Sequence, residues 1–133
     1  MPPLTFIVDP KGNAPVYRQI MDQIRYAIAG GTLVPGDQLP SIRELARDLV
    51  VNPMTVVKAY TELSHEGTVV LQHGRGAFVT ATGRTLSVSA REQLLRKTLV
   101  QVAVEAVQLG IDAPTAARLL SEEIRNLKGT SHG

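Results

Sequence analysis

Two helix-start signals lie close together in the middle of this chain. Ser41, with Glu44 three positions later, has the form of a capping box, in which each side chain satisfies a free backbone amide at the start of a helix. Asn52 followed by Pro53 is a second start, with asparagine as the N-cap and proline at the first helical position. Only a short helix fits between the two signals. The chain is therefore predicted to turn sharply around residues 50–52, as in a helix-turn-helix motif.

The segments on either side extend this motif. A longer helix is predicted from residue 15 to residue 30, because apolar residues recur there at helical spacing. The helix that starts at Asn52 is expected to end near residue 67, and two short strands follow at 68–72 and 77–80. The order predicts a mainly α fold with a small β-hairpin wing, a winged helix-turn-helix domain, over residues 1–80. The predicted loop of the wing consists of His73, Gly74, Arg75 and Gly76.

The remainder of the chain has a different pattern. Residues 81–89 are small and polar and are predicted to be a linker, and residues 90–133 are predicted to contain an antiparallel helix pair. The first of these helices is apolar on more than one side, and two helices cannot cover that much apolar surface themselves. We therefore predict a dimerisation segment that pairs with its copy in a second subunit, although packing on the preceding domain is an open alternative. The predicted dimer contacts are Leu95, Leu99, Val102, Ala106, Leu120 and Ile124.

Composition excludes several classes of function. The 133 residues include no cysteine, which excludes a disulfide framework, a thiol nucleophile and a thiolate metal site. The sequence has no His-x-x-x-His pair, no carboxylate cluster and no phosphate-binding glycine loop, so neither an enzyme nor a cofactor or metal is predicted. No signal-peptide pattern and no membrane-length apolar run is present, so we expect a cytoplasmic protein with no membrane partner. The net charge of +2 gives no evidence by itself for a nucleic-acid partner.

The helix that starts at Asn52 has a polar face opposite its apolar face, and this polar face is not required for packing. Met54, Lys58 and Thr61 lie opposite the apolar positions, with Thr55 on the flank. A lysine, hydroxyls and a flexible apolar side chain near the amino end of a capped helix suit contacts with DNA phosphates and base edges. In a helix-turn-helix protein this helix lies in the major groove. From the pattern alone, an ordinary solvated helix face explains these residues equally well.

Several motifs, in the same order, resemble the GntR family of bacterial transcription regulators. The resemblance runs from about residue 6 to residue 79, more than half of the chain, and the short C-terminal segment is similar to the YtrA-like subfamily. The matching motifs are Pro15–Ile20, Gly31–Pro40, Leu39–Ala46, Val51–Val56, Ala59–Leu63, Glu66–Gly67 and Gly74–Val79.

The resemblance implies which residues contact DNA. In the family, the serine and arginine that match Ser41 and Arg43 contact the DNA backbone and bases, and the threonine that matches Thr55 suits a phosphate contact. An arginine at the tip of the wing is favoured electrostatically in a narrow minor groove. The predicted DNA-contacting residues are Ser41, Arg43, Asn52, Met54, Thr55, Lys58, His73, Gly74, Arg75 and Gly76. The alternatives are a salt bridge from Arg43 to Asp48 or Glu44, helix capping by Asn52 and Thr55, and a plain hairpin turn at residues 74–76.

The chain also departs from the family pattern. Many members carry arginines at the positions of Pro53 and Val57, and neither of these residues can donate a charged hydrogen bond. Lys58 is the nearest cationic substitute. This departure affects the expected operator sequence and not the expected mode of binding.

The resulting prediction is a sequence-specific transcription regulator, a repressor, that binds double-stranded operator DNA with an inverted repeat as a homodimer. A small-molecule effector would act by changing the separation of the two reading helices, and its existence is left open. The alternative from another class is a winged-helix protein-interaction module without DNA affinity.

Overall fold

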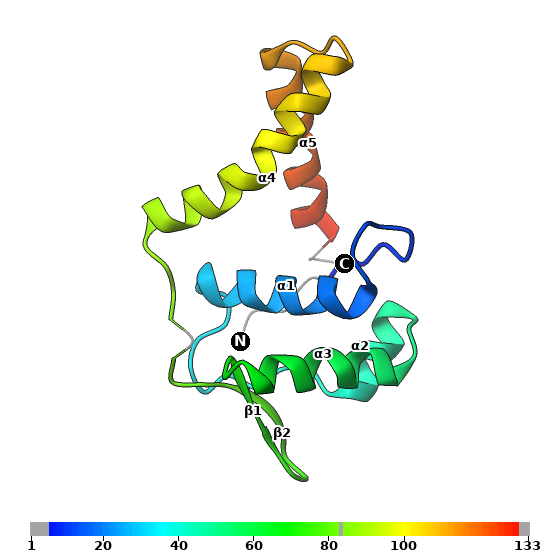
Figure 1. Ribbon diagram of the computed structural model, residues 1–133, viewed down its shortest axis with the longest axis vertical. Coiled ribbons are helices and arrows are strands. Elements are labelled where there is room, and N and C mark those ends of the chain that lie inside the picture. Colours follow the sequence, from blue (N-terminus) through cyan, green and yellow to red (C-terminus); the bar gives the residue numbers. More distant parts are fainter. Residues whose placement is uncertain (1–5, 83, 131–133) are drawn as a thin grey trace. The chain divides into compact units, whose positions relative to one another are not determined.

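The computed structural model describes residues 6–82 and 84–130. It divides into two compact units, one up to Leu86 and one from Ser87 onward. The first contains α1 (Val16–Ala29), α2 (Ile42–Leu49), α3 (Pro53–His65) and the strands β1 (Val69–Gln72) and β2 (Gly76–Val79), and the second contains α4 (Val88–Gln108) and α5 (Ala113–Thr130) (Figure 1). The expected mainly α fold with a winged helix-turn-helix is confirmed.

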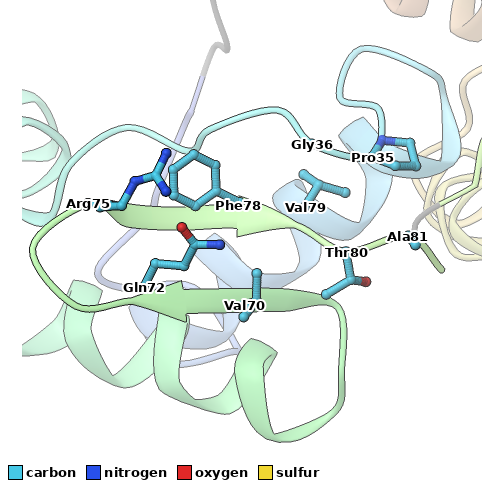
Figure 2. Close-up of a pocket in the computed structure, with 9 residues that line it drawn as sticks. All are labelled: Pro35, Gly36, Val70, Gln72, Arg75, Phe78, Val79, Thr80 and Ala81. Atoms are coloured by element: carbon cyan, nitrogen blue, oxygen red, sulfur yellow. The ribbon is translucent and has the colours of Figure 1, made fainter.

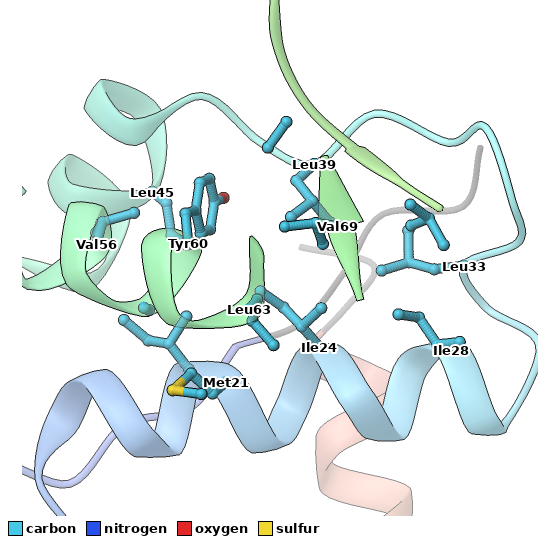
Figure 3. Close-up of a cluster of buried hydrophobic side chains, with 14 of the residues drawn as sticks. Met21, Ile24, Ile28, Leu33, Leu39, Leu45, Val56, Tyr60, Leu63 and Val69 are labelled. Atoms are coloured by element: carbon cyan, nitrogen blue, oxygen red, sulfur yellow. The ribbon is translucent and has the colours of Figure 1, made fainter. Parts of the chain in front are cut away.

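The core of the first unit lies between α1, α3 and the wing, which is the β1–β2 hairpin. Helix α3 packs against α1, α2 and β1. Each fully buried aliphatic side chain contributes about 1.5–3 kcal/mol to folding, so this cluster is the main source of stability in the unit. Figure 3 shows part of the cluster, with the labelled side chains of Met21, Ile24, Ile28, Leu33, Leu39, Leu45, Val56, Tyr60, Leu63 and Val69.

The predicted capping box at the start of α2 is present. The amide of Glu44 donates to Oγ of Ser41 at 3.1 Å, and the Glu44 carboxylate accepts from the Ser41 amide at 3.4 Å. Leu45 and Ala46 are buried, but Ile42, which helical spacing places on the same face, is 36% exposed. Helix α2 buries its middle turn, so a side chain at its first position extends beyond the contact with α3.

The corner between α2 and α3 contains a strained residue. Val50 is the C-cap of α2 and has φ 55°, the left-handed conformation that a β-branched side chain disfavours. Asn52 then caps α3, as expected, because its Oδ1 accepts from the Met54 amide at 2.8 Å. Pro53 occupies the first helical position, where its missing N–H costs nothing.

The wing is joined to the segment that leads into α2. Strands β1 and β2 pair antiparallel from Val69 opposite Val79 to Gln72 opposite Gly76. Residues 36–39 run beside β2 and form three backbone hydrogen bonds with it, from Gly36 to Val79 (2.9 Å), from Val79 to Asp37 (2.8 Å) and from Leu39 to Ala77 (2.8 Å). The base of the wing and the start of α2 are therefore fixed with respect to each other.

The second unit consists of two capped helices. Helix α4 begins at Val88, two residues before the expected Ala90, because Oγ of Ser87 accepts from the Ala90 amide at 3.1 Å. Oδ1 of Asp112 accepts from the Thr115 amide at 2.9 Å at the start of α5, and this hydrogen bonding lowers the pKa of Asp112 below its ordinary value. No helix in the described ranges is long and apolar enough to span a membrane.

Candidate nucleic-acid interface

The amino end of α2 presents a free cation. Arg43 lies in the first turn and is exposed, and its guanidinium makes no ion pair with any residue that the structure describes. The two alternative partners are engaged elsewhere, since Asp48 faces Arg47 at 3.8 Å and Glu44 completes the capping box. Ser41 uses its oxygen as the cap, and its hydroxyl hydrogen is still available to donate. This end of α2 therefore offers donors, and the positive end of the helix dipole, to an anion.

One residue outside the predicted site, Tyr60, holds the start of α2 in place. The hydroxyl of Tyr60, a buried residue of α3, donates to the carbonyl of Pro40 at 2.6 Å. Burial raises the pKa of Tyr60, and the Glu44 carboxylate raises it further, so the hydroxyl stays protonated and continues to donate. This hydrogen bond fixes the residue directly before Ser41.

The amino end of α3 carries apolar and uncharged polar side chains and no cation. Met54 is 66% exposed, Thr55 is half-buried and Pro53 has no N–H to offer. Asn52 is engaged through its Oδ1 as the N-cap, which leaves its amide NH₂ as a donor. The groups that this turn exposes are therefore an amide, a hydroxyl and an apolar side chain.

Lys58 is held against the neighbouring helix. Its ammonium lies over the ring of Tyr17 in α1, 4.3 Å from the ring centroid, and the side chain remains exposed. A cation over an aromatic face at this distance is attracted by the ring quadrupole. The ammonium group in the first half of α3 is therefore in contact with α1.

The tip of the wing carries the second free cation of the predicted set. His73, Gly74, Arg75 and Gly76 are all exposed, and Gly74 has φ +73°. The Arg75 guanidinium carbon lies 5.9 Å from the centroid of the Phe78 ring, at the edge of an open hollow of about 600 Å³ on this face of the hairpin (Figure 2). Aromatic contact on one side orients the guanidinium without neutralising it.

The structure brings the predicted DNA-contacting residues into one unit. They lie at the start of α2, in the first half of α3 and at the tip of the wing. Residues 36–40 connect the wing to the start of α2. The roles of Tyr17, Tyr60 and Phe78 were not predicted. Tyr17 and Tyr60 each act on a residue far away in the sequence, so neither periodicity nor a local motif could have identified them, whereas Phe78 lies three positions from Arg75 on the same hairpin.

The histidines form no metal centre in the described part of the chain. No group of three or more histidine, cysteine, aspartate or glutamate side chains that could hold a metal ion occurs among the described residues. His65 ends α3 and His73 lies in the wing, while His132 falls outside the described residues.

The predicted dimer contacts all lie in the second unit. Along α4, Leu95 and Val102 are 57% and 46% exposed, and Leu99 and Ala106 are half-buried. Along α5, Leu120 and Ile124 are 45% and 47% exposed. No residue of α4 is buried.

Comparison with known proteins identifies the family. Residues 16–79 match the model of the bacterial regulatory proteins of the gntR family. The HTH-type transcriptional repressor YtrA of Bacillus subtilis is 34% identical over 122 residues, which cover 92% of this chain and 94% of that protein.

Solved structures agree with this comparison. YtrA from Sulfolobus acidocaldarius, a GntR-family transcription factor, has a TM-score of 0.53 and 41% identity over 74% of this chain and 97% of that one. The DNA-binding domain of AraR in complex with operator ORX1 has a TM-score of 0.51 and 28% identity over 56% of this chain and 92% of that one. The family and these relatives are transcription regulators and not enzymes. The chain therefore belongs to the GntR family and is a DNA-binding transcription regulator.

Proposed function

We propose that this protein is a repressor that binds an inverted-repeat operator as a homodimer, with α3 in the major groove and the wing in the minor groove. The observation that carries the proposal is the exposed Arg43 guanidinium, free of any described acidic partner, at the capped amino end of α2. The YtrA of Bacillus subtilis is named a repressor, which supports the direction of regulation. A bacterial repressor acts on the chromosome, so the proposed location is the cytoplasm.

The proposed contacts divide between positioning and reading. Arg43 and Ser41 bind the phosphate backbone and a base edge, and Arg43 is able to bind two acceptors of a guanine or a phosphate at once. Met54 and Thr55 face the bases from the first turn of α3, where an apolar side chain suits a thymine methyl group. The remaining proposed contacts are Asn52, Lys58, His73, Gly74, Arg75 and Gly76.

The second unit supports the homodimer. Helices α4 and α5 diverge from the connection at residues 109–112 (Figure 1) and leave leucine, valine and isoleucine side chains exposed along both helices. Apolar helix faces of this size are normally covered by a partner. We propose residues 90–133 as the dimerisation segment, residues 1–80 as the DNA-binding domain and residues 81–89 as the linker. A second copy supplies a matching surface, and the resulting dyad accounts for an inverted-repeat operator.

A DNA-binding experiment tests the proposal. Operator sequences are selected from a random pool of duplexes with the full-length protein, and the affinity for the selected duplex is then measured across salt concentration. We expect an inverted repeat, and log K that falls with log salt by about 0.9 for each phosphate contacted. No binding at low salt, or selected sequences without dyad symmetry, would contradict the proposal.

Arginine variants identify the surface used. Arg43→Ala is expected to weaken binding to the selected duplex by about tenfold or more, because a bidentate arginine contact is worth about 1–3 kcal/mol. The matched control is Arg47→Ala, at the other end of α2, where the side chain is 72% exposed and pairs with Asp48. Equal losses for the two variants would show that Arg43 contributes only general charge.

A further inference from the structure

One polar side chain joins the tip of the wing to the segment before α2. Nε2 of Gln38 donates to the carbonyl of Arg75 at 2.9 Å, although the two residues are 37 positions apart in the sequence. Gln38 is itself exposed, and its backbone forms an isolated bridge with Phe78. The glutamine therefore reaches from one side of the hairpin to the residue at its tip.

The glycine next to Arg75 makes room for this contact. Gly76 has φ +120°, a conformation that other residues rarely adopt. A Cβ atom built on Gly76 would lie 2.7 Å from Nε2 of Gln38, closer than a real Cβ contact. A side chain at residue 76 would therefore displace the end of the Gln38 side chain from its present position.

The contact lies where the backbone hydrogen bonds end. The strand ladder stops at Gln72 opposite Gly76, and the bonds from residues 36–39 reach no further along β2 than Ala77. Beyond these bonds, the tip has the turn bond from the Arg75 amide to the Gln72 carbonyl at 2.9 Å, which is internal to the hairpin. Among the described residues, the Gln38 side chain is the hydrogen-bonded link from the tip to the body of the domain.

We propose that Gln38 is a positioning residue for DNA binding, which holds Arg75 of the wing in a fixed direction relative to the start of α2. The Gln38 amide restrains the Arg75 backbone, and Phe78 restrains its guanidinium, so little freedom of the tip is lost when DNA binds. Ser41 and Arg43 follow Gln38 closely in the sequence. The segment from residue 38 to residue 43 therefore positions Arg43 and Arg75 relative to each other. The inference rests on the proposed contact between Arg75 and the minor groove.

A double-mutant cycle in the full-length protein tests this role. The variants are Gln38→Met, which keeps the length of the side chain and removes the donor, Arg75→Ala, and the combination of both. We expect Gln38→Met to weaken binding to the selected duplex by about fivefold, which corresponds to about 1 kcal/mol. In the Arg75→Ala background the same change is expected to have no further effect, because the group that Gln38 directs is gone.

Two further measurements separate positioning from folding. Thermal melting is expected to stay within about 1 °C of the wild type for Gln38→Met, because an exposed side chain contributes little to stability. The backbone amides of residues 73–75 are expected to become more mobile in ¹⁵N relaxation of the free protein. Gln23→Met in α1 is the matched control, since it removes a comparable side-chain donor, which bonds to the Ile7 carbonyl at 2.6 Å, and it is expected to change neither binding nor tip mobility.

Each outcome has a distinct meaning. If Arg75→Ala weakens binding and Gln38→Met does not, the positioning role is wrong and the proposed function stands. An equal loss from Gln38→Met in both backgrounds also overturns the inference, because the glutamine then acts independently of Arg75. If Arg75→Ala has no effect, the wing contact and the inference fail together, while binding through Arg43 remains. Absence of any DNA binding by the wild type would remove the proposed function itself.

Discussion

At the scale of single residues, Val50 is the position where local preference and fold disagree. It has φ 55° and is 89% exposed, so no burial offsets the cost of a β-branched side chain in the left-handed region. Such a conformation costs about 1–3 kcal/mol and persists only when the surrounding structure imposes it. Here the hydrogen bonds from the Val50 amide to Arg47 and from the Val51 amide to Ala46 close the end of α2 and impose it.

Replacement of this residue gives a stability prediction. Val50→Gly is expected to raise the free energy of unfolding by about 1 kcal/mol, because glycine adopts this φ without a Cβ clash. Chemical denaturation at equilibrium measures the change. Val50→Ala is the control, since it removes the exposed methyl groups but keeps the Cβ, and it should gain much less. A gain of equal size for alanine would show that the exposed apolar side chain, and not the backbone, carries the cost.

At the scale of elements, two separate sets of hydrogen bonds fix the start of α2. The capping box of Ser41 and Glu44 satisfies the free amides at the start of the helix, and the hydroxyl of Tyr60 in α3 binds the preceding Pro40 carbonyl. The first device is visible in the sequence because its residues are neighbours. The second depends on the packing of α2 against α3, which places a side chain of one helix beside the entry to the other.

Removal of the Tyr60 hydroxyl oxygen tests the hydrogen bond to Pro40. Tyr60→Phe is expected to lower the free energy of unfolding by about 1–2 kcal/mol, because the Pro40 carbonyl loses its partner in a part-buried place. Urea denaturation is the measurement, and Tyr26→Phe, at a ring that is 52% exposed, is the matched control with no expected loss. If both variants are as stable as the wild type, the Tyr60 hydrogen bond makes no net contribution.

At the scale of the whole molecule, a net charge of +2 is compatible with DNA binding because of where the cations lie. Arg43 and Arg75 are exposed on the first unit without an acidic partner among the described residues. Arg25, by contrast, is engaged by Asp22 at 2.8 Å and by Glu66 at 2.9 Å and joins α1 to the end of α3. The low net charge therefore reflects paired charges that stabilise the fold and a few free ones that are available to phosphates.

The proposed dimer gives a prediction at this scale. Leu95→Glu is expected to shift the protein from dimer to monomer in sedimentation, because it places a carboxylate in the apolar stripe of α4. Val100→Glu is the matched control, with 59% exposure against 57% for Leu95 and a position about 140° away around the helix. If Val100→Glu dissociates the dimer and Leu95→Glu does not, the interface lies on the other face of α4.

The sequence by itself determined the elements of this protein and their order. Helix starts at Ser41 and Asn52, the buried face of α3 and the hairpin with its glycine loop are all encoded by residues within a few positions of each other. Local hydrogen bonds and side-chain periodicity depend on the neighbouring sequence, so they are readable without a fold. The family motifs extended this to the candidate DNA-contacting residues, because they mark the same local positions.

Only the tertiary structure decided how those residues are held. The bond from Gln38 to Arg75, the bond from Tyr60 to Pro40 and the contact between Lys58 and Tyr17 each join places far apart in the chain. The exposure of Ile42 likewise depends on tertiary packing, because periodicity gives the direction of a side chain and not the extent of the surface that covers it. Such contacts arise when α1, α3 and the wing pack around a shared core, and their geometry is a property of that packing and not of any local pattern.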